Sequence, residues 1–272
     1  IEAGMGGLHD STNVFTSLAV ICTSIGLDHQ AYLGESHAAI AQNKAGVMKA
    51  GVPLIYATDR EDVADDFEER AQELACPSYR LGRDFSYRDQ GAGFDFFYQG
   101  ECIEGIDLAM PGQHQRANAS LALMTMQLLK EQYPALSKEI ILSALSRSCW
   151  LGRTEFIRPN LMIDGAHNNE SVQVLVEVLQ STYADKEIHI LFAAIEGKPV
   201  TTMLEMLNQF TSLTVTSFQF PMAIKAEAYP KGYNHLPSWQ DWLERVEEDG
   251  DKLYVITGSL YFISEIRQAL VG

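Results

Sequence analysis

The chain has 272 residues, of which 46% are hydrophobic and 21% are charged. This composition is typical of a soluble globular protein, and the length predicts two domains with a core that needs no disulfide or metal. The net charge of −16 argues against a nonspecific nucleic-acid surface, which requires clustered Lys and Arg. Since no apolar run approaches the ~20 residues of a membrane span and no signal peptide opens the chain, we expect a cytoplasmic protein.

The four cysteines are widely scattered and form no C-x-x-C pair, so the sequence indicates neither a zinc site nor a redox motif. Cys22 and Cys149 lie in apolar runs, and we expect both to be small buried hydrophobic residues in a reducing compartment. The chain opens on Ile1 without an initiator methionine, and we expect it to be a fragment.

The first part of the chain alternates between strand and helix patterns. Residues 18–23 form an apolar run of strand length, the pattern of a parallel strand that is covered on both faces. A helix is predicted over residues 36–47, with Ser36 as its N-cap. Because strand 52–57 and helix 61–74 follow, this part predicts a βαβ sheet.

The residue pattern changes after this predicted sheet. Glycines and alternating aromatic residues between 79 and 108 predict short antiparallel strands near a sheet edge, and two helices follow over 113–131 and 137–147. The later predicted elements are strand 161–163, helix 169–180, strand 188–193, helix 202–210, strand 213–218, strand 253–256 and a last helix. We place the boundary near residues 148–153, which gives two α/β domains, 1–148 and 149–272.

Polar clusters follow the predicted strands, and ligands of open α/β sheets bind at strand carboxyl ends. Residues 2–13 begin with Glu2 and contain three glycines in four positions, which suits close approach to a phosphate but also occurs in ordinary loops. His29 could ligate a metal or be a hydrogen-bonded structural residue. Lys44 could serve a site or extend to solvent. The run 164–168, Asp-Gly-Ala-His-Asn, could bind a ligand or cap a helix through Asn168 or Asn169.

Taken in order, these motifs resemble the folylpolyglutamate synthase and dihydrofolate synthase branch of the Mur ligase superfamily. The resemblance runs from Glu2 to about Phe262. It is carried by Glu-Ala-Gly-Met-Gly-Gly and Asp-Ser-Thr-Asn in residues 2–13, Ile-Gly-Leu-Asp-His at 25–29, Asn-Lys-Ala-Gly-Val at 43–47, Pro-Gly-Gln-His-Gln at 111–115, Gly-Arg-Thr-Glu at 152–155 and Asp-Gly-Ala-His-Asn at 164–168.

The resemblance implies an ATP-dependent ligase that adds L-glutamate to a folate through an acyl phosphate, with Mg²⁺ as cofactor and possible dihydrofolate synthase activity in addition. It implies a Mur-ligase-type parallel-sheet domain followed by a Rossmann-like C-terminal domain. Glu2 and His29 match magnesium ligands of the family, and Lys44 matches a lysine that is carbamylated there. We therefore expect Glu2, His29 and Lys44 to be the catalytic and metal-binding residues, with the Lys44 amine directed toward His29.

Further positions match substrate contacts of the family. Asn118 matches an adenine contact. Arg153, Asp164 and His167 match contacts of the second domain to ATP, with Arg153 near phosphate and Asp164 near the ribose. Residues Asp10 and Ser11 match the loop that touches the pterin. We expect Asp164 and His167 to face the first domain across a cleft, and we expect a monomer that binds folate, glutamate and ATP but neither nucleic acid nor membrane.

The phosphate-binding loop of the family, close to Gly-Thr-Asn-Gly-Lys-Gly-Ser, is absent from the sequence. The dipeptide Gly197-Lys198 cannot replace it, because Pro199 follows. We expect the loop to lie upstream of Ile1, and the 272-residue chain alone to bind ATP poorly and to catalyse nothing. Two other interpretations are a different Mur-type amide ligase and a non-catalytic nucleotide-binding paralogue; the Asp-Ser-Thr-Asn loop favours the folate branch over the former.

Overall fold

The computed structural model forms two compact units. It describes residues 1–27, 29–91, 93–248 and 250–272. The first unit comprises residues 1–109 and 113–148, and the second comprises residues 110–112 and 149–272. In the described part of the chain, no helix is both long enough and apolar enough to cross a membrane.

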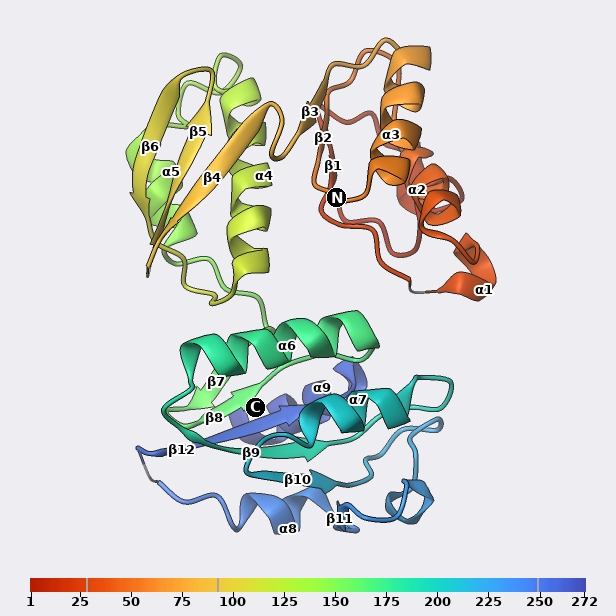
Figure 1. Cartoon of the computed structure of the whole chain (residues 1–272), viewed down its shortest axis with the longest axis vertical. Helices are drawn as coiled ribbons and strands as arrows, with labels where there is room; N and C mark the ends of the chain where they lie inside the picture. Colours follow the sequence, from red (N-terminus) through yellow and green to blue (C-terminus); the bar gives the residue numbers. More distant parts are fainter. Residues whose placement is uncertain (28, 92, 249) are drawn as a thin grey trace. The chain divides into compact units, whose positions relative to one another are not determined.

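A parallel sheet in the order β1-β2-β3 forms the start of the first unit (Figure 1). Its strands are β1 (Val20–Cys22), β2 (Leu54–Tyr56) and β3 (Ser78–Arg80). Helices α2 (His37–Ala45) and α3 (Glu61–Glu73) pack on one face and bury Cys22 and Tyr56 with their own apolar side chains. Ser36 caps α2 through its hydroxyl, as predicted.

The opposite face of β1 departs from the prediction. Val20 and Cys22 are buried beneath α2 and α3, whereas the side chain between them, Ile21, is 44% exposed. The expectation that this strand is covered on both faces is therefore wrong for the described residues. The apolar run also includes Leu18, which is 51% exposed, so hydrophobicity alone did not reveal which face has a covering element.

The predicted antiparallel strands form a separate sheet in the order β4-β5-β6. They are β4 (Phe85–Gln90), β5 (Gly93–Tyr98) and β6 (Glu101–Ile106). Helix α4 (Gln113–Leu129) covers this sheet and also reaches Ile55 of β2, so one apolar cluster joins the two sheets. Helix α5 (Lys138–Leu145) packs beside α4 through half-buried side chains.

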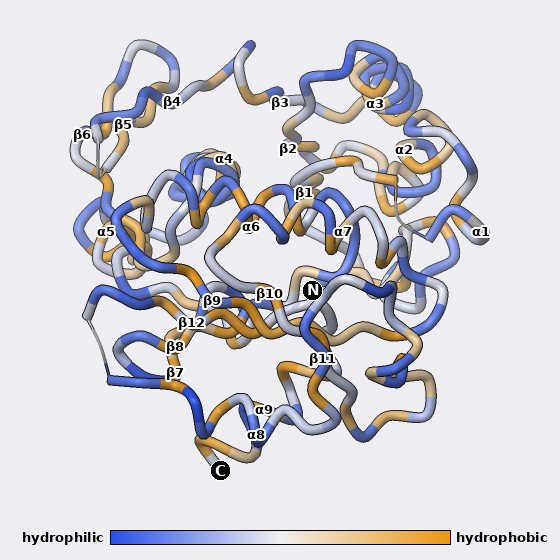
Figure 2. The backbone as a smooth tube through the Cα atoms, turned by 60° about the horizontal axis from the view of Figure 1, so that its bottom comes forward, coloured by the Kyte–Doolittle hydropathy of each residue, from blue (hydrophilic) through white to orange (hydrophobic). Residues whose placement is uncertain are grey.

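The second unit is a six-stranded sheet in the order β11-β10-β9-β12-β8-β7. Only β7 is antiparallel to its neighbour. The strands are β7 (Glu155–Arg158), β8 (Leu161–Ile163), β9 (Glu187–Phe192), β10 (Ser212–Val215), β11 (Asn234–His235) and β12 (Lys252–Thr257). The central strands are strongly apolar (Figure 2), as expected of strands that are buried on both faces.

Helices cover both faces of this sheet. One apolar cluster joins it to α6 (Asn169–Thr182) and α7 (Val200–Leu207), and another joins it to α8 (Trp239–Leu243) and α9 (Leu260–Val271). Met162 faces the first cluster, while its neighbours on β8 face the second, as the alternation of side chains along a strand requires. The prediction of an α/β fold is confirmed.

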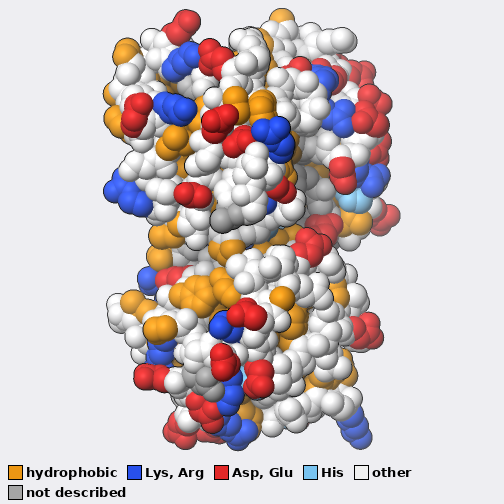
Figure 3. Space-filling model, turned by 60° about the vertical axis from the view of Figure 1, so that its left-hand side comes forward, with side chains coloured by type: hydrophobic (Ala, Val, Ile, Leu, Met, Phe, Trp, Pro, Cys, Tyr) orange, Lys and Arg blue, Asp and Glu red, His pale blue; other side chains and the backbone are white. Residues whose placement is uncertain are grey.

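The cysteine prediction is half right. Cys22 is buried, but Cys149 is exposed, because it follows α5 in a segment with little packing around it. On the face shown in Figure 3, Lys and Arg side chains are interspersed with Asp and Glu. This mixture is consistent with the acidic composition of the chain.

Candidate functional site

The glycine-rich loop, residues 4–13, is held against the end of α2. The Leu8 amide donates to the Asn43 carbonyl at 2.9 Å, and the Gly7 amide donates to the Asn43 side-chain oxygen at 3.1 Å. From the loop side, the Asn13 amide group donates to the carbonyls of Leu8 and Gly46, both at 3.1 Å. Hydrogen bonds thus join the loop to Asn43 near the end of α2 and to Gly46 just after it.

This packing explains the glycines. Gly6 has a φ of +65°, and a Cβ there would lie 2.3 Å from the Asn43 side-chain oxygen. A Cβ at Gly7 would lie 2.7 Å from the Lys44 carbonyl oxygen. Both values are far below any normal contact, so only glycine fits. The sequence suggested that these glycines admit a phosphate, but the partner that requires them here is the backbone and Asn43 of α2.

Asp10 organises the same loop. Its carboxylate accepts hydrogen bonds from the Met5 amide at 2.9 Å and from both the amide and the hydroxyl of Thr12, at 2.9 and 2.5 Å. These bonds, led by the one from the Thr12 hydroxyl, lower the pKa of Asp10 to about 2. Asp10 caps the short 3₁₀ helix η1 (Ser11–Val14), on which Ser11 is exposed. Of the two residues predicted to meet the pterin, Ser11 is the more accessible.

We expect the Asp10 carboxyl to titrate near pH 2, below its ordinary pKa of 3.8, in the 272-residue chain. Since the folded state lowers this pKa, Asp10 stabilises the loop above the ordinary value, and that contribution is lost as the pH falls through about 2. Carboxyl carbon chemical shifts followed by NMR measure the midpoint. A midpoint near 4 for Asp10 would contradict the hydrogen bonding described above.

Lys44 lies in the last turn of α2 and is half-buried. Its positive charge acts on the thiol of Cys22, the last residue of β1, although burial dominates and raises the pKa of that thiol to about 11. Cys22 shares an apolar cluster with Ala41 and Ala45, so Lys44 belongs to the helix that packs at the carboxyl end of β1, where ligands of parallel sheets bind.

His29 and Glu2 are both exposed. His29 has a φ of 55° and begins the short helix α1 (Gln30–Leu33), whereas Asp28 of the same motif lies outside the described residues. Among the residues that the structure describes, no three His, Cys, Asp or Glu side chains form a group able to hold a metal ion. The assignment of Glu2, His29 and Lys44 to a magnesium site stays a prediction.

In the second unit, three predicted residues come together at the carboxyl end of β8. Asp164 follows this strand and is only 7% exposed, and the charges of Arg153 and His167 both act on its carboxyl group. Burial is the largest influence and raises the pKa of Asp164. The His167 ring lies 2.8 Å from the Gly165 carbonyl oxygen through Nδ1. The predicted nucleotide contacts of this unit therefore share one location.

Asp164 also has a structural task. Its two oxygens accept hydrogen bonds from the Thr154 amide at 2.8 Å and the Ala166 amide at 2.9 Å. Thr154 has a φ of 41°, an uncommon conformation for a β-branched residue. Asn168 caps α6, as the alternative interpretation of this motif predicted. The motif at 164–168 thus builds the turn, and Arg153 and His167, both half-buried, are the side chains closer to solvent.

Two features of these motifs were not predicted. Glu155 accepts from the Gly152 amide at 2.7 Å and pairs with Arg267 of α9 at 2.9 Å, which anchors the Gly-Arg-Thr-Glu motif. Asn13 and Asn43 join the loop to α2. Glu155, Asn13 and Asn43 lie inside motifs that the sequence analysis singled out, whereas Arg267 does not. Membership of a motif was therefore the sequence signal that could have indicated these three contacts. Asn118, the predicted adenine contact, is half-buried on α4, where its amide donates to the Gln115 side chain at 3.4 Å.

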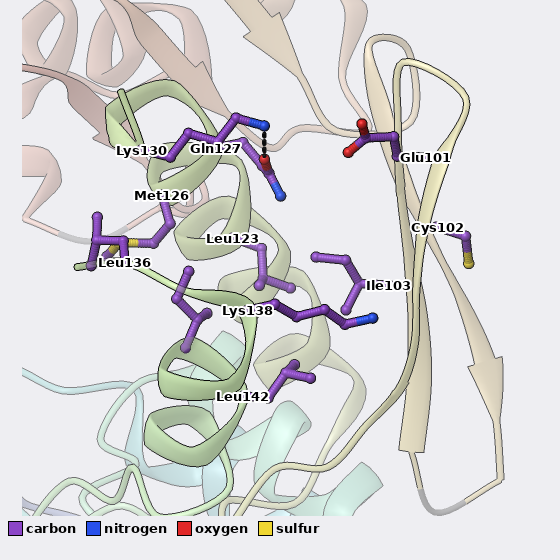
Figure 4. Close-up of a pocket in the computed structure, with 11 residues that line it drawn as sticks. Glu101, Cys102, Ile103, Leu123, Met126, Gln127, Lys130, Leu136, Lys138 and Leu142 are labelled. Carbon is purple, nitrogen blue, oxygen red and sulfur yellow. Dashed lines mark hydrogen bonds between the residues drawn. The ribbon is translucent and has the colours of Figure 1, made fainter. Parts of the chain in front are cut away.

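A cavity of about 250 Å³ lies elsewhere in the first unit, between β6, α4 and α5. Leu123 and Ile103 are among its apolar lining residues, and the Lys138 side chain extends across it toward β6, below Lys130 in the view of Figure 4. Lys130 donates to the Gln127 side chain at 3.0 Å. The cavity contains none of the predicted site residues. We therefore keep the candidate site at the predicted motifs and not at this cavity.

Comparison with known proteins identifies the family. No family model matches the chain. It is 34% identical over 99% of its length to the dihydrofolate synthase/folylpolyglutamate synthase of Bacillus subtilis, and 33% identical over its whole length to the folylpolyglutamate synthase of Lacticaseibacillus casei. It spans 66% of the length of each relative.

Solved structures agree. The apo form of the L. casei FPGS matches the whole chain with a TM-score of 0.83 at 30% identity, and so does an FPGS complex with AMPPCP and folate. In both cases the chain covers 66% of the solved structure. Sequence similarity along the whole chain and the same fold lead to one conclusion: the chain belongs to the folylpolyglutamate synthase/dihydrofolate synthase family.

Proposed function

We propose that this chain is part of an ATP-dependent ligase that joins L-glutamate to a folate through an amide bond. The observation that carries the proposal is the whole-chain similarity to an FPGS structure that holds both AMPPCP and folate. In the proposed reaction, ATP phosphorylates a folate carboxylate, and the amine of glutamate attacks the acyl phosphate. Phosphate leaves, and the proton of the amine passes to solvent or to a nearby base.

The residues of this chain would position charge for that reaction. Lys44, on the helix that packs on Cys22 at the end of β1, would act on the transferring phosphoryl group, either as a cation or, once carbamylated, as an oxygen ligand for Mg²⁺. Glu2 and His29 would complete the magnesium ligands from this chain. Magnesium, when bound, would neutralise charge on the transferring phosphoryl oxygens. The exposed positions of Glu2 and His29 leave both side chains accessible to a nucleotide.

We propose that the second unit contributes to nucleotide binding through Arg153 and His167, with Asp164 holding the turn between them. Arg153 would meet a phosphate, since a guanidinium can donate two parallel hydrogen bonds to it. On the first unit, Asn118 would contact the adenine and Ser11 the pterin. That Asp164 and His167 face the first unit across a cleft stays a prediction.

The test is a ligation assay. The full-length protein that carries this sequence, incubated with MgATP, glutamate and either tetrahydrofolate or dihydropteroate, should extend at least one acceptor by a glutamate and release ADP and phosphate in equal amounts. The 272-residue chain alone spans 66% of its relatives and lacks a phosphate-binding loop, so we expect no product from it. ATP hydrolysis by the full-length protein without any acceptor-dependent product would contradict the proposal.

We further propose that the protein is a cytoplasmic monomer that does not bind nucleic acid. The acidic net charge of −16 and the interspersed surface charges support the last point. Sedimentation of the full-length protein at micromolar concentration should give a single species of monomer mass. A salt-sensitive complex with duplex DNA or RNA would contradict the proposal.

A further inference from the structure

Asn43 is placed to set the relative position of two predicted parts of the active site. It precedes Lys44 on α2, and both its backbone and its side chain accept hydrogen bonds from the glycine-rich loop, from Leu8 and Gly7 respectively. A Cβ at Gly6 would lie 2.3 Å from the Asn43 side-chain oxygen, so a side chain at position 6 would collide with Asn43 as it is placed. One residue thus fixes the loop beside the helix that carries the lysine.

Asn13 closes the contact from the other direction. Its amide group donates to the carbonyl of Gly46, which follows the last turn of α2, and its oxygen accepts from the Lys49 ammonium at 2.6 Å. Along the chain, Ser11 lies between Leu8, which bonds to Asn43, and Asn13, which bonds to Gly46. The proposed pterin-contacting segment is therefore tied to α2 at both ends, and it cannot shift without breaking one of these contacts.

We propose that Asn43 is a positioning residue for ligation: it holds the Ser11 segment in register with Lys44, so that a folate held by the loop presents its carboxylate to the group that Lys44 helps to activate. The proposal rests on the ligase function proposed above. It assigns no contact between Asn43 and substrate. Its physical basis is that two sites on one rigid body keep their spacing, whereas a loosened loop spreads the substrate over many positions, of which few are reactive.

Three variants of the full-length protein separate positioning from packing. Asn43→Leu has nearly the same shape and removes the acceptor for the Gly7 amide, whereas Asn43→Asp keeps an acceptor there. Gln42→Leu is the matched control: Gln42 is the preceding residue on α2, and its side chain donates to Asp66 of α3 at 2.8 Å instead of to the loop. Each variant is examined by hydrogen exchange of residues 4–13, by thermal unfolding and by steady-state kinetics.

We expect Asn43→Leu to raise amide exchange in residues 4–13 by about tenfold, since one buried donor loses its partner, and to lower kcat/KM for the folate by at least about tenfold. The Asp variant should recover both values to within about threefold, and Gln42→Leu should resemble the wild type in both.

The outcomes divide clearly. Unchanged exchange in Asn43→Leu overturns the proposal, because the loop then does not depend on this side chain. Faster exchange with wild-type kcat/KM also overturns it, because the contact is then structural only. A wild-type protein with no ligase activity overturns the ligase function itself. An active wild type together with an Asn43→Leu variant that has wild-type exchange or wild-type kcat/KM overturns the positioning role alone.

Discussion

In the full-length protein, Lys44→Ala should reduce ligation by a factor on the order of 10²–10³, which corresponds to about 3–4 kcal/mol of lost transition-state stabilisation. The reason is the location of Lys44 on the last turn of α2, the helix that packs on Cys22 at the end of β1. A group that orients charge around a transferring phosphoryl group contributes mainly to the transition state, so kcat should fall more than KM rises.

The fold should survive this change. Lys44 is only half-buried, so its removal should shift the free energy of unfolding by less than about 1 kcal/mol. If Lys44 acts as a carbamate, small acids such as acetate should restore part of the activity by filling the vacated anionic site.

The control is Lys130→Ala, which removes a lysine from the same unit at the cavity between β6, α4 and α5. Both variants are compared by steady-state kinetics with MgATP, glutamate and a folate. If Lys44→Ala retains activity within about threefold of the wild type, as expected for a lysine that only extends along the surface, Lys44 has no part in the mechanism.

The second large effect should follow from Asp164→Ala, which we expect to destabilise the second unit by about 2–4 kcal/mol. The substitution leaves the amides of Thr154 and Ala166 without their acceptor, in a place where Asp164 itself is only 7% exposed. Thr154 should then leave its left-handed conformation, and the Gly-Arg-Thr-Glu motif should lose its position. Asp164→Asn retains one acceptor oxygen and should cost roughly half as much.

Chemical denaturation of the second unit, followed by the fluorescence of Trp239 and Trp242, measures this effect. The pH dependence gives an independent check. Because burial raises the folded-state pKa of Asp164, the wild type should lose part of its stability as the pH rises from the ordinary pKa through the raised one. The Ala and Asn variants should lack this contribution. Equal stability of wild type and Asp164→Ala at neutral pH would show that the two backbone hydrogen bonds are unimportant.

Local patterns predicted much of this fold because the physical signals involved are local. Ser36 precedes an apolar helix and caps α2, and the run 161–163 is followed by Asp164 at the end of β8. Both are decided by neighbours within a few residues. The antiparallel strand β7 and the short helix α8 were not predicted. β7 depends on pairing with β8, and α8 depends on packing against the six-stranded sheet, more than either depends on its own pattern.

What sequence patterns did not reveal were contacts between distant segments. Gly6 and Gly7 look like ligand-approach glycines until Asn43 is seen beside them, 36 positions after Gly7. Cys149 and Ile21 have apolar neighbours in sequence, yet both are exposed, because burial requires a covering element that the local pattern does not specify. The Arg267–Glu155 ion pair is equally invisible until α9 is placed on the sheet.

The most direct test of the proposed ligase chemistry follows oxygen atoms. The full-length protein is supplied with MgATP, glutamate and a folate whose reacting carboxylate is labelled with ¹⁸O, and the released phosphate is examined by mass spectrometry. An acyl phosphate predicts that one labelled oxygen passes from the carboxylate to inorganic phosphate for each amide bond formed. Amide formation with unlabelled phosphate would contradict the mechanism, and labelled folate that gains no glutamate would contradict the function.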